Sequence, residues 1–178
     1  MIERGIQVDH STIMRWVHQY SPEIEKKIRR PLRPTNDSWR VDETYITVKG
    51  EWKYLYRAVD SDGNTINFML SATRNRKAAK RFLKKALSSN PNQMPKAITV
   101  DGNPAYPIAI HELKNETKLY KRVEIRQVKY SNSIVEQDHR SIKRIVNPIL
   151  GFQSFQSANK TLKGIEAMNM IKKDKSII

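Results

Sequence analysis

WRVDETYITVKGEWKYLYRAVD, residues 39–60, combines a strong strand pattern with an acidic residue in its interior. Aromatic and β-branched residues dominate positions 39–48, a lysine-glycine pair is typical of a turn, and positions 54–59 predict a second strand. Asp42 therefore lies inside a predicted strand. A carboxylate buried in a strand is costly unless a metal ion, an arginine or a hydrogen bond compensates its charge, and the sequence leaves these three alternatives open.

Strand and helix patterns continue downstream of this stretch. The turn-forming residues 61–64 lead into a predicted third strand over 65–71, so the domain begins as an antiparallel meander. The remaining patterns predict a helix over 76–88, a short buried strand within 96–101, a helix from Pro104 or Pro107 to about residue 115, a strand over about 122–128, and a helix over 133–146.

The N-terminal residues predict part of a helix-turn-helix. Gly5 indicates a turn and Asp9 or Ser11 an N-cap, so we expect a short helix up to about residue 20. Arg15 and His18 on this helix face away from an apolar stripe, which consists of Ile13, Trp16, Val17 and Tyr20. The second helix of a helix-turn-helix enters the major groove of DNA, but a helix that packs on a neighbour explains the same pattern.

Prolines mark a boundary ahead of the acid-bearing strand. Ser21-Pro22 predicts the start of a second helix, and the prolines of the segment 31–38 end it. We therefore expect four segments, which are a partial helix-turn-helix over 1–21, a helix and linker over 22–38, a core over 39–147 and a helical tail over 148–178.

The composition argues against several classes of protein. The chain has no cysteine and four histidines, which disfavours zinc fingers, iron-sulfur clusters and disulfide scaffolds. No apolar run approaches the roughly 18 residues of a membrane span, and the N-terminus lacks the apolar core of a signal peptide. We expect a soluble cytoplasmic protein that does not contact the membrane.

The net charge of +15 indicates a polyanionic partner. Residues 39–147 carry 21 basic and 11 acidic side chains, a difference of +10, so most of the excess lies in the segment that contains Asp42. The predicted helix over 76–88 shows the excess most clearly. Its apolar face lies opposite a basic face without acids, which consists of Lys77, Lys80, Arg81, Lys84 and Lys85. Such a face either solubilises the protein or follows DNA phosphates.

Two further acids occupy positions that favour ligand binding. Asp101 ends a predicted strand just before Gly102, where α/β sheets collect ligands, although an aspartate in a turn is also common there. Glu136, Arg140 and Lys143 are spaced at i, i+4 and i+7 on the predicted helix over 133–146. They lie beside an apolar stripe formed by Val135, Ile142, Ile145 and Val146. Ser133 and Glu136 also fit a capping box, in which Glu136 would only bind the backbone of the helix start.

Asp42, Asp101 and Glu136 are more specific together than singly. They occupy a first strand, a later strand end and a helix, and 34 residues separate the last two acids. This pattern resembles the DDE transposase and integrase superfamily. The segments WRVDETYITVKGEWKYLYRAVD, VDGNPAY, SNSIVEQDHRSIKR and GFQSFQSANKTLKGIEAM are similar to the small transposases of bacterial insertion sequence family six. The resemblance implies an α/β, ribonuclease H-like fold, in which helices flank a mixed β-sheet that follows a partial helix-turn-helix.

The resemblance also implies roles for the three acids. Two divalent ions, Mg²⁺ or Mn²⁺, would stabilise charge on the attacking and leaving oxygens, with Asp42 binding both ions and Asp101 and Glu136 one each. Lys143 and Arg140 would grip the DNA phosphate beside the scissile bond. Glu43 is set aside as a ligand because strand alternation points it to the opposite face from Asp42.

The implied function is transposition. We expect hydrolysis at the ends of an insertion sequence and strand transfer to target DNA, by a homo-oligomer that binds terminal inverted repeats at the bacterial nucleoid. Family members have further residues ahead of Gly5, so we expect an N-terminally truncated copy with weakened end recognition. Two alternatives stay open, a non-catalytic DNA-binding remnant and a ribonuclease H-like nuclease limited to hydrolysis.

Overall fold

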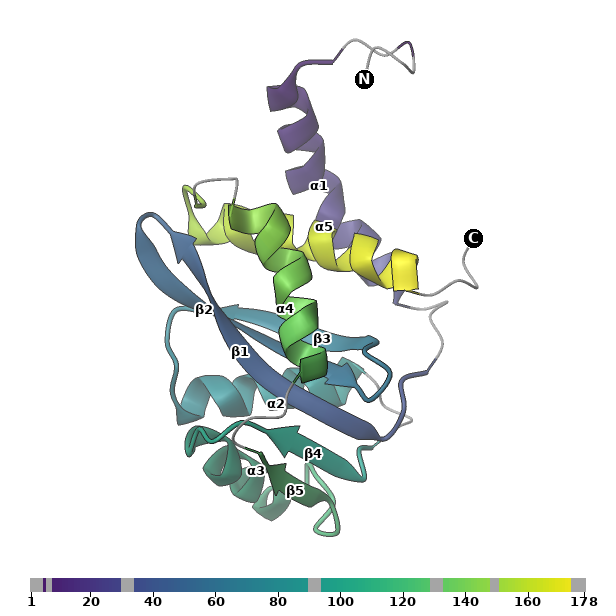
Figure 1. Ribbon diagram of the computed structural model, residues 1–178, viewed down its shortest axis with the longest axis vertical. Helices are drawn as coiled ribbons and strands as arrows, with labels where there is room; N and C mark the ends of the chain where they lie inside the picture. The colour runs from purple at the N-terminus through teal and green to yellow at the C-terminus, as the bar shows by residue number, and fades with distance from the viewer. Residues whose placement is uncertain are drawn as a thin grey trace. The chain divides into compact units, whose positions relative to one another are not determined.

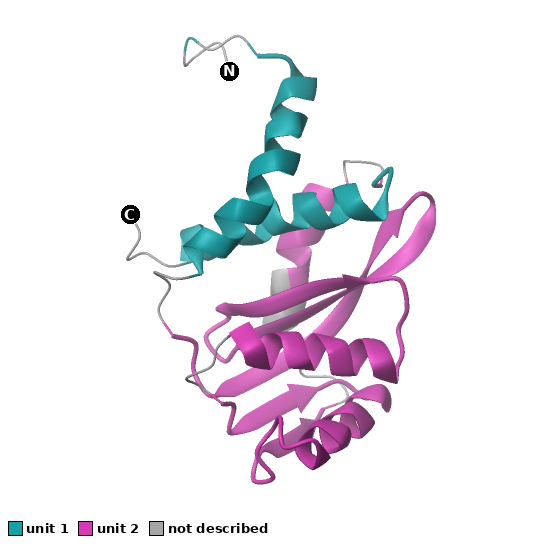
Figure 2. Ribbon diagram, turned by 180° about the vertical axis from the view of Figure 1, so that it is seen from behind, with its two compact units in different colours: residues 1–33, 152–178 teal, residues 34–151 magenta. Residues whose placement is uncertain are grey.

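The computed structural model describes residue 5 and residues 8–29, 34–89, 94–128, 133–147 and 151–173, without the side chains of 133–138. The chain forms two compact units (Figure 2). One unit comprises residues 34–151, and the other combines residues 1–33 with residues 152–178. None of the helices in the described part of the chain has the length and apolar character that a membrane crossing requires.

A mixed sheet forms the centre of the unit over 34–151. Its described strands follow the order β3-β2-β1-β4-β5, in which the first three are antiparallel and the last three parallel. The strands are β1 (Ser38–Val48), β2 (Glu51–Asp60), β3 (Thr65–Ser71), β4 (Ala97–Val100) and β5 (Glu124–Gln127). The predicted meander and mixed sheet are confirmed, while β2 begins three residues earlier than predicted and β5 is shorter.

Helices cover both faces of this sheet (Figures 1 and 2). The helices α2 (Arg76–Ser89) and α3 (Ala105–Asn115) lie on one face, and α4 (Ser133–Val146) lies on the other. The main core forms between the sheet and the first two of these helices, where Trp39, Phe82 and Tyr106 are fully buried. The predicted apolar face of α2 is therefore confirmed.

The buried stripe of α4 differs from the predicted one. His139, Ile142 and Val146 are buried, whereas Ile145 is 45% exposed. Ile145 is about 100° around the helix from Val146 and about 60° from Ile142, on the side away from Val146, so it lies at the edge of the buried stripe. The side chain of Val135 lies outside the described part of the chain.

The second unit pairs the two ends of the chain. Its helices are α1 (His10–Ile28) and α5 (Phe155–Lys173), which pack against each other. Asp9 caps α1, since its carboxylate accepts a hydrogen bond of 3.0 Å from the backbone N–H of Ser11. The sequence alone does not predict the pairing of the two ends.

The expected break at Pro22 is wrong, because α1 continues through this residue. A proline inside a helix costs about 3 kcal/mol, which the packing of α1 against α5 offsets. Gly164 of α5 lies against Val17 and Ser21, so the missing side chain lets the helices approach closely at this turn. Trp16 and Tyr20 of the predicted apolar stripe are 45% and 46% exposed.

Candidate active site

The register of two parallel strands brings Asp42 and Asp101 together. Val41 of β1 pairs with Val100 of β4, so Asp42, the next residue of β1, and Asp101, the residue that follows β4, lie next to each other. Asp101 follows the carboxyl end of β4, where α/β sheets bind ligands. Ligand atoms of Asp42, Glu43 and Asp101 all lie within 4.8 Å of one another.

Asp101 lies in a structured turn. Its Oδ1 accepts a hydrogen bond of 3.0 Å from the backbone N–H of Asn103, whose own Oδ1 accepts one of 3.0 Å from the N–H of Ala105. Asp101 therefore shapes the turn and also lies near the other acids, and its role as a ligand stays a prediction. Burial raises the pKa of Asp101, and the nearby charge of Glu43 raises it further. The site thus holds an ionised Asp101 only against an electrostatic cost, which a cation would relieve.

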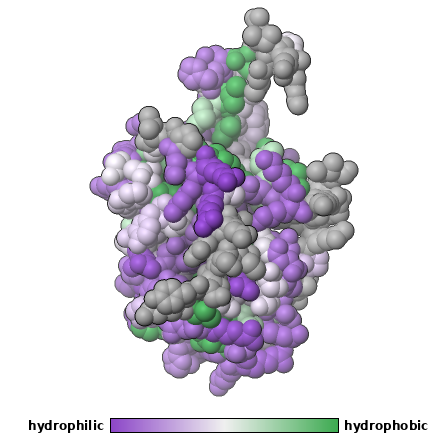
Figure 3. Space-filling model, in the orientation of Figure 1, coloured by the Kyte–Doolittle hydropathy of each residue, from purple (hydrophilic) through white to green (hydrophobic). Residues whose placement is uncertain are grey.

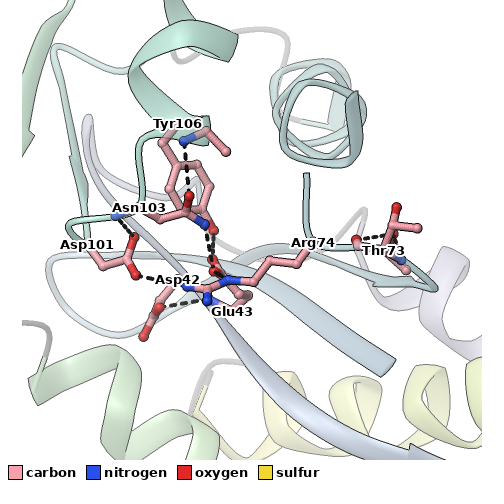
Figure 4. A network of polar contacts seen from close by, with 9 residues as sticks. Asp42, Glu43, Thr73, Arg74, Asp101, Asn103 and Tyr106 are labelled. Carbon is pink, nitrogen blue, oxygen red and sulfur yellow. Dashed lines mark hydrogen bonds and ion pairs between the residues drawn. The ribbon is translucent and has the colours of Figure 1, made fainter. Parts of the chain in front are cut away.

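Glu43 belongs to the acidic cluster although strand alternation sets it aside. Its side chain is 1% exposed and accepts hydrogen bonds from Asn103 Nδ2 at 3.1 Å, from Arg74 Nε and from the Tyr106 hydroxyl (Figure 4). The glutamate therefore points to the α3 side of the sheet, as predicted. One oxygen of its carboxylate still lies within 4.8 Å of carboxylate oxygens of Asp42 and Asp101. Asn103, in the turn after β4, joins Glu43 to the turn that holds Asp101.

Arg74 supplies positive charge to this acidic cluster. Besides its ion pair with Glu43, its Nη2 lies 3.6 Å from Asp101 Oδ2, and its side chain is 37% exposed. Burial raises the pKa of Tyr106, and the charge of Glu43 raises it further, so the tyrosine remains a hydrogen-bond donor to Glu43. Burial and the same carboxylate raise the pKa of Tyr56 to about 12.

Asp42 has neighbours that fit two of the alternatives left open by the sequence. The backbone N–H of Glu43 donates a hydrogen bond of 2.8 Å to Asp42 Oδ1. Arg57, which is fully buried, stands directly across from Asp42 on β2. Opposite charges at such cross-strand positions attract each other. Neither neighbour excludes a metal ion.

The donor set of the cluster fits a hard divalent cation. Carboxylate oxygens are the ligands that Mg²⁺ and Mn²⁺ prefer, and each of the three clustered acids offers one oxygen. The third predicted ligand, Glu136, lies on α4, which packs against β1 and β2. Its side chain is outside the described part of the chain, and so are its predicted approach to the aspartates and its alternative capping role.

The basic face of α2 forms ion pairs with acids from another part of the chain. Lys80 Nζ lies 2.5 Å from Glu112 and 2.7 Å from Glu116, and Lys84 Nζ lies 2.8 Å from Glu116. The expectation of a face without acids is therefore wrong for these two lysines, because Glu112 of α3 and Glu116, the C-cap of that helix, lie beside them. Lys77 and Arg81 are exposed, and Arg81 donates a hydrogen bond of 3.3 Å to Ser71 Oγ. Contact of these four residues with DNA stays a prediction.

The other predicted DNA contacts lie on α4 and α1. Arg140 is exposed and Lys143 is half-buried. Arg15 is exposed and donates to Thr12 Oγ1 at 3.3 Å, and His18 Nε2 lies 3.3 Å from Thr161 Oγ1 of α5. Figure 3 shows hydrophilic residues over most of the coloured part of one face, as a chain with a net charge of +15 requires.

Comparison with known sequences identifies the pattern around these acids. Residues 36–175 match the DDE domain of IS240-type transposases. The chain is 36% identical over 166 residues to the transposase for the insertion sequence-like element IS431mec of Staphylococcus aureus, covering 93% of this chain and 71% of that protein. Identity is also 36%, over 165 residues and with the same coverage, to the transposase for insertion sequence element IS257 in transposon Tn4003 of the same species.

Solved structures show the same fold at low sequence identity. The integrase catalytic core domain of HTLV-2, solved in complex with magnesium in a dimeric form, superposes with a TM-score of 0.59 and 18% identity, covering 78% of this chain and 89% of that one. An intasome chain of simian T-cell lymphotropic virus gives a TM-score of 0.56 and 17% identity, covering 79% of this chain and 51% of that one. The ribonuclease H-like fold expected from the sequence is confirmed.

Proposed function

This chain belongs to the DDE transposase family, and we propose that it cleaves DNA at the ends of an insertion sequence and joins those ends to target DNA. The observation that carries the proposal is the register of β1 and β4, which places Asp42 beside Asp101 in a chain whose residues 36–175 match the DDE domain. Water would attack the phosphorus at the end of the element and release a 3′-hydroxyl. That hydroxyl would then attack a target phosphorus and displace the 3′-oxygen of the target strand.

DDE transposases use divalent metals, and we propose that Asp42, Asp101 and Glu136 hold two Mg²⁺ or Mn²⁺ ions here. When bound, such ions stabilise negative charge on the attacking and leaving oxygens. The acidic cluster fits this demand because its carboxylates repel one another and burial already raises the pKa of Asp101. Glu136 is included from the family pattern and from its place on α4.

The residues around the acids position the site. Glu43 fixes Asn103 and Arg74, and Asn103 in turn fixes the Asp101 carboxylate through its backbone N–H. Arg74 offsets part of the negative charge of the cluster from 3.6 Å. Lys143 and Arg140 carry the positive charge that would hold the DNA phosphate beside the scissile bond.

The proposed partners are the terminal inverted repeats of the element and its target DNA. The net charge of +15 supports binding to a polyanion, and it is concentrated in the segment 39–147. A transposase must hold two element ends at once, so we further propose that the chain works as a homo-oligomer on the DNA of the bacterial nucleoid. The assignment of residues 1–21 to a partial helix-turn-helix stays a prediction.

A strand-transfer assay tests this function. A pre-cut oligonucleotide with a free 3′-hydroxyl, incubated with Mg²⁺ and a supercoiled target plasmid, should give joined products with the wild-type chain and none with Glu136→Gln. Glu124→Gln, at an exposed glutamate on β5, is the matched control and should retain activity. Cleavage without joining would indicate a hydrolytic nuclease, and DNA binding without either reaction would indicate a non-catalytic remnant.

A separate variant addresses the capping role of the same helix start. Ser133→Ala should cost about 0.5–2 kcal/mol of stability by removing the predicted cap, while sparing most of the strand transfer. Glu136→Gln should do the reverse. If both variants lose activity in proportion to their loss of stability, Glu136 is a capping residue and its assignment as a metal ligand is wrong.

A further inference from the structure

Aromatic side chains gather on the exposed end of the β1–β2 hairpin. The turn between these strands uses positive φ angles at Lys49 and Gly50, which suits a tight hairpin. Trp52 is 65% exposed and Tyr45 is 44% exposed. The ring centroids of these two residues lie 6.1 Å apart at an angle of 80°, and the ring of Tyr54 lies 5.3 Å from that of Tyr45. The hairpin therefore presents organised aromatic faces to solvent.

These rings border a cavity that is also lined by a lysine and an asparagine side chain. The cavity has a volume of about 450 Å³ and is lined, among the described residues, by Tyr45, Trp52, Lys143 and Asn147. This volume falls within the range of about 300–1,000 Å³ typical of small-molecule sites. Aromatic faces stack on flat rings, a lysine attracts phosphate, and an asparagine amide matches the donor and acceptor edge of a base. The lining thus has the chemistry of a nucleotide site.

Both β1 and α4 carry a predicted catalytic acid and a residue that lines the cavity, and the two residues are about equally far apart along each element. Tyr45 is three residues beyond Asp42 on β1, which is about 10 Å along the strand, and strand alternation points it to the opposite face of β1, the face of Glu43. Lys143 is seven residues beyond Glu136 on α4, which is about 10.5 Å at the rise of a helix. A distance of about 10 Å corresponds to about three base steps along one DNA strand.

We propose that this cavity binds one unpaired nucleobase, within about three nucleotides of the scissile phosphate, stacked on Tyr45 and Trp52 with Lys143 against the adjoining phosphate. The proposal rests on the proposed function, which supplies DNA as the substrate. A base inside a duplex already has both faces stacked on its neighbours, so only a base that has left the helix can lie against these rings. The cavity would therefore hold open the first pairs of the element end.

Fluorescence of 2-aminopurine tests the binding without any reaction. Oligonucleotides carry this base at one of the first five positions from the joining end, and the full chain is added in Ca²⁺ or in chelator. We expect a position-specific fluorescence change within about three nucleotides of the end, which disappears in Trp52→Ala and is largely retained in Trp52→Phe. Tyr120→Ala removes another exposed tyrosine, 53% exposed and outside the cavity, and should behave as wild type.

A comparison with abasic DNA identifies the base as the ligand. Trp52→Ala should weaken the binding of DNA with the intact base by about five- to hundredfold, the loss expected for one stacked base. The same variant should leave the binding of DNA that lacks this base unchanged. If Trp52→Ala weakens the binding of both DNAs equally, the proposal is overturned. It is also overturned if Trp52→Ala changes the oligomeric state of the protein in the absence of DNA, measured by analytical ultracentrifugation, because the rings would then form a contact between two copies of the chain.

The two proposals fail in different assays. A wild-type chain that joins no DNA strands refutes the proposed function, whereas the base site is judged by fluorescence and affinity in the absence of reaction. A chain that joins strands but shows no position-specific fluorescence change refutes the base site alone.

Discussion

The acidic cluster at the end of β4 and the charged surface between α2 and α3 use the same kinds of side chain with opposite balance. In the cluster, Asp42, Glu43 and Asp101 lie together, with Arg74 beside Glu43 and Asp101 and Arg57 across from Asp42. Between the helices, Arg76, Lys80 and Lys84 pair with Glu112 and Glu116 near solvent. An excess of partly buried negative charge is costly and is retained where a cation is to be bound. A network of ion pairs near solvent, with its charges largely paired, costs little and mainly joins the two helices.

Removal of one clustered carboxylate should produce the largest difference between the two regions. Asp101→Asn should reduce strand transfer by about 10³-fold or more, since the carboxylate supports several kcal/mol of transition-state charge stabilisation. The melting temperature in chelator should not fall, because an uncharged side chain relieves the repulsion with Glu43. Joining assays and calorimetry measure both effects. A parallel loss of activity and melting temperature would mean that Asp101 acts only through the fold.

A second contrast concerns the stability that each region provides. Glu43→Gln should destabilise the protein by about 1.5–3 kcal/mol, since the buried carboxylate accepts charge-assisted hydrogen bonds that an amide replaces poorly. Glu112→Gln, which removes the charge of an acid near solvent, should have a much smaller effect. Urea unfolding of both variants provides the comparison. Equal losses would contradict the distinction drawn between the buried and the exposed network.

The two regions should also respond to pH in opposite directions. Burial raises the pKa of Asp101, so the folded state holds its proton more tightly, and ionisation costs stability as the pH rises through the folded pKa. Hydrogen bonds from Lys80 and Lys84 lower the pKa of Glu116 to about 2, so its contribution is present above about pH 4.5 and is lost as the pH falls towards 2.

Melting temperatures between about pH 2 and pH 7, in chelator and at constant ionic strength, check these signs. Relative to the wild type, Asp101→Asn should gain stability as the pH rises above about 4. Glu116→Gln should lose stability relative to the wild type as the pH rises from about 2 to about 4.5. Curves that move in the same direction would show that one of the two electrostatic environments is misassigned.

The smallest effect concerns the dependence of DNA binding on salt. Each phosphate neutralised by the protein adds roughly −0.9 to the slope of log K against log salt concentration. The double variant Lys77→Gln and Arg81→Gln should flatten the slope by up to about 1.8. Lys80→Gln with Lys84→Gln should flatten it less, because these lysines already face glutamates of α3. An unchanged slope in both variants would make α2 a solvated surface.

Local patterns were sufficient to predict most of the fold of the unit over 34–151. The span of β3 agrees with the predicted 65–71, and the buried positions of α2 follow its periodicity. The place of Asp42 inside a strand and of Asp101 after one was predictable from local signals, whereas their proximity was implied by the resemblance to DDE transposases. These signals arise within a few residues of each position, which explains why they can be seen in one sequence.

Contacts between distant segments were not predictable in this way. Glu112 and Glu116 meet α2 only because α3 packs beside it, and the role of Glu43 depends on a turn sixty residues away. Pro22 signals a helix start locally, yet packing against α5 keeps α1 continuous. In each case tertiary packing overrides a local preference or adds a partner that no periodicity contains.

The pairing of α1 with α5 has a consequence for biosynthesis. Translation proceeds at about 5–20 residues per second, so α1 is complete about 6–25 seconds before α5 begins to emerge from the ribosome. During this interval Ile28, which α5 residues bury in the finished chain, has no partner to pack against. The sheet with its acidic cluster lies between the two helices in the sequence and is synthesised before α5. A nascent chain released early would therefore carry the strands that hold Asp42 and Asp101 together with an unpaired, protease-accessible N-terminal helix.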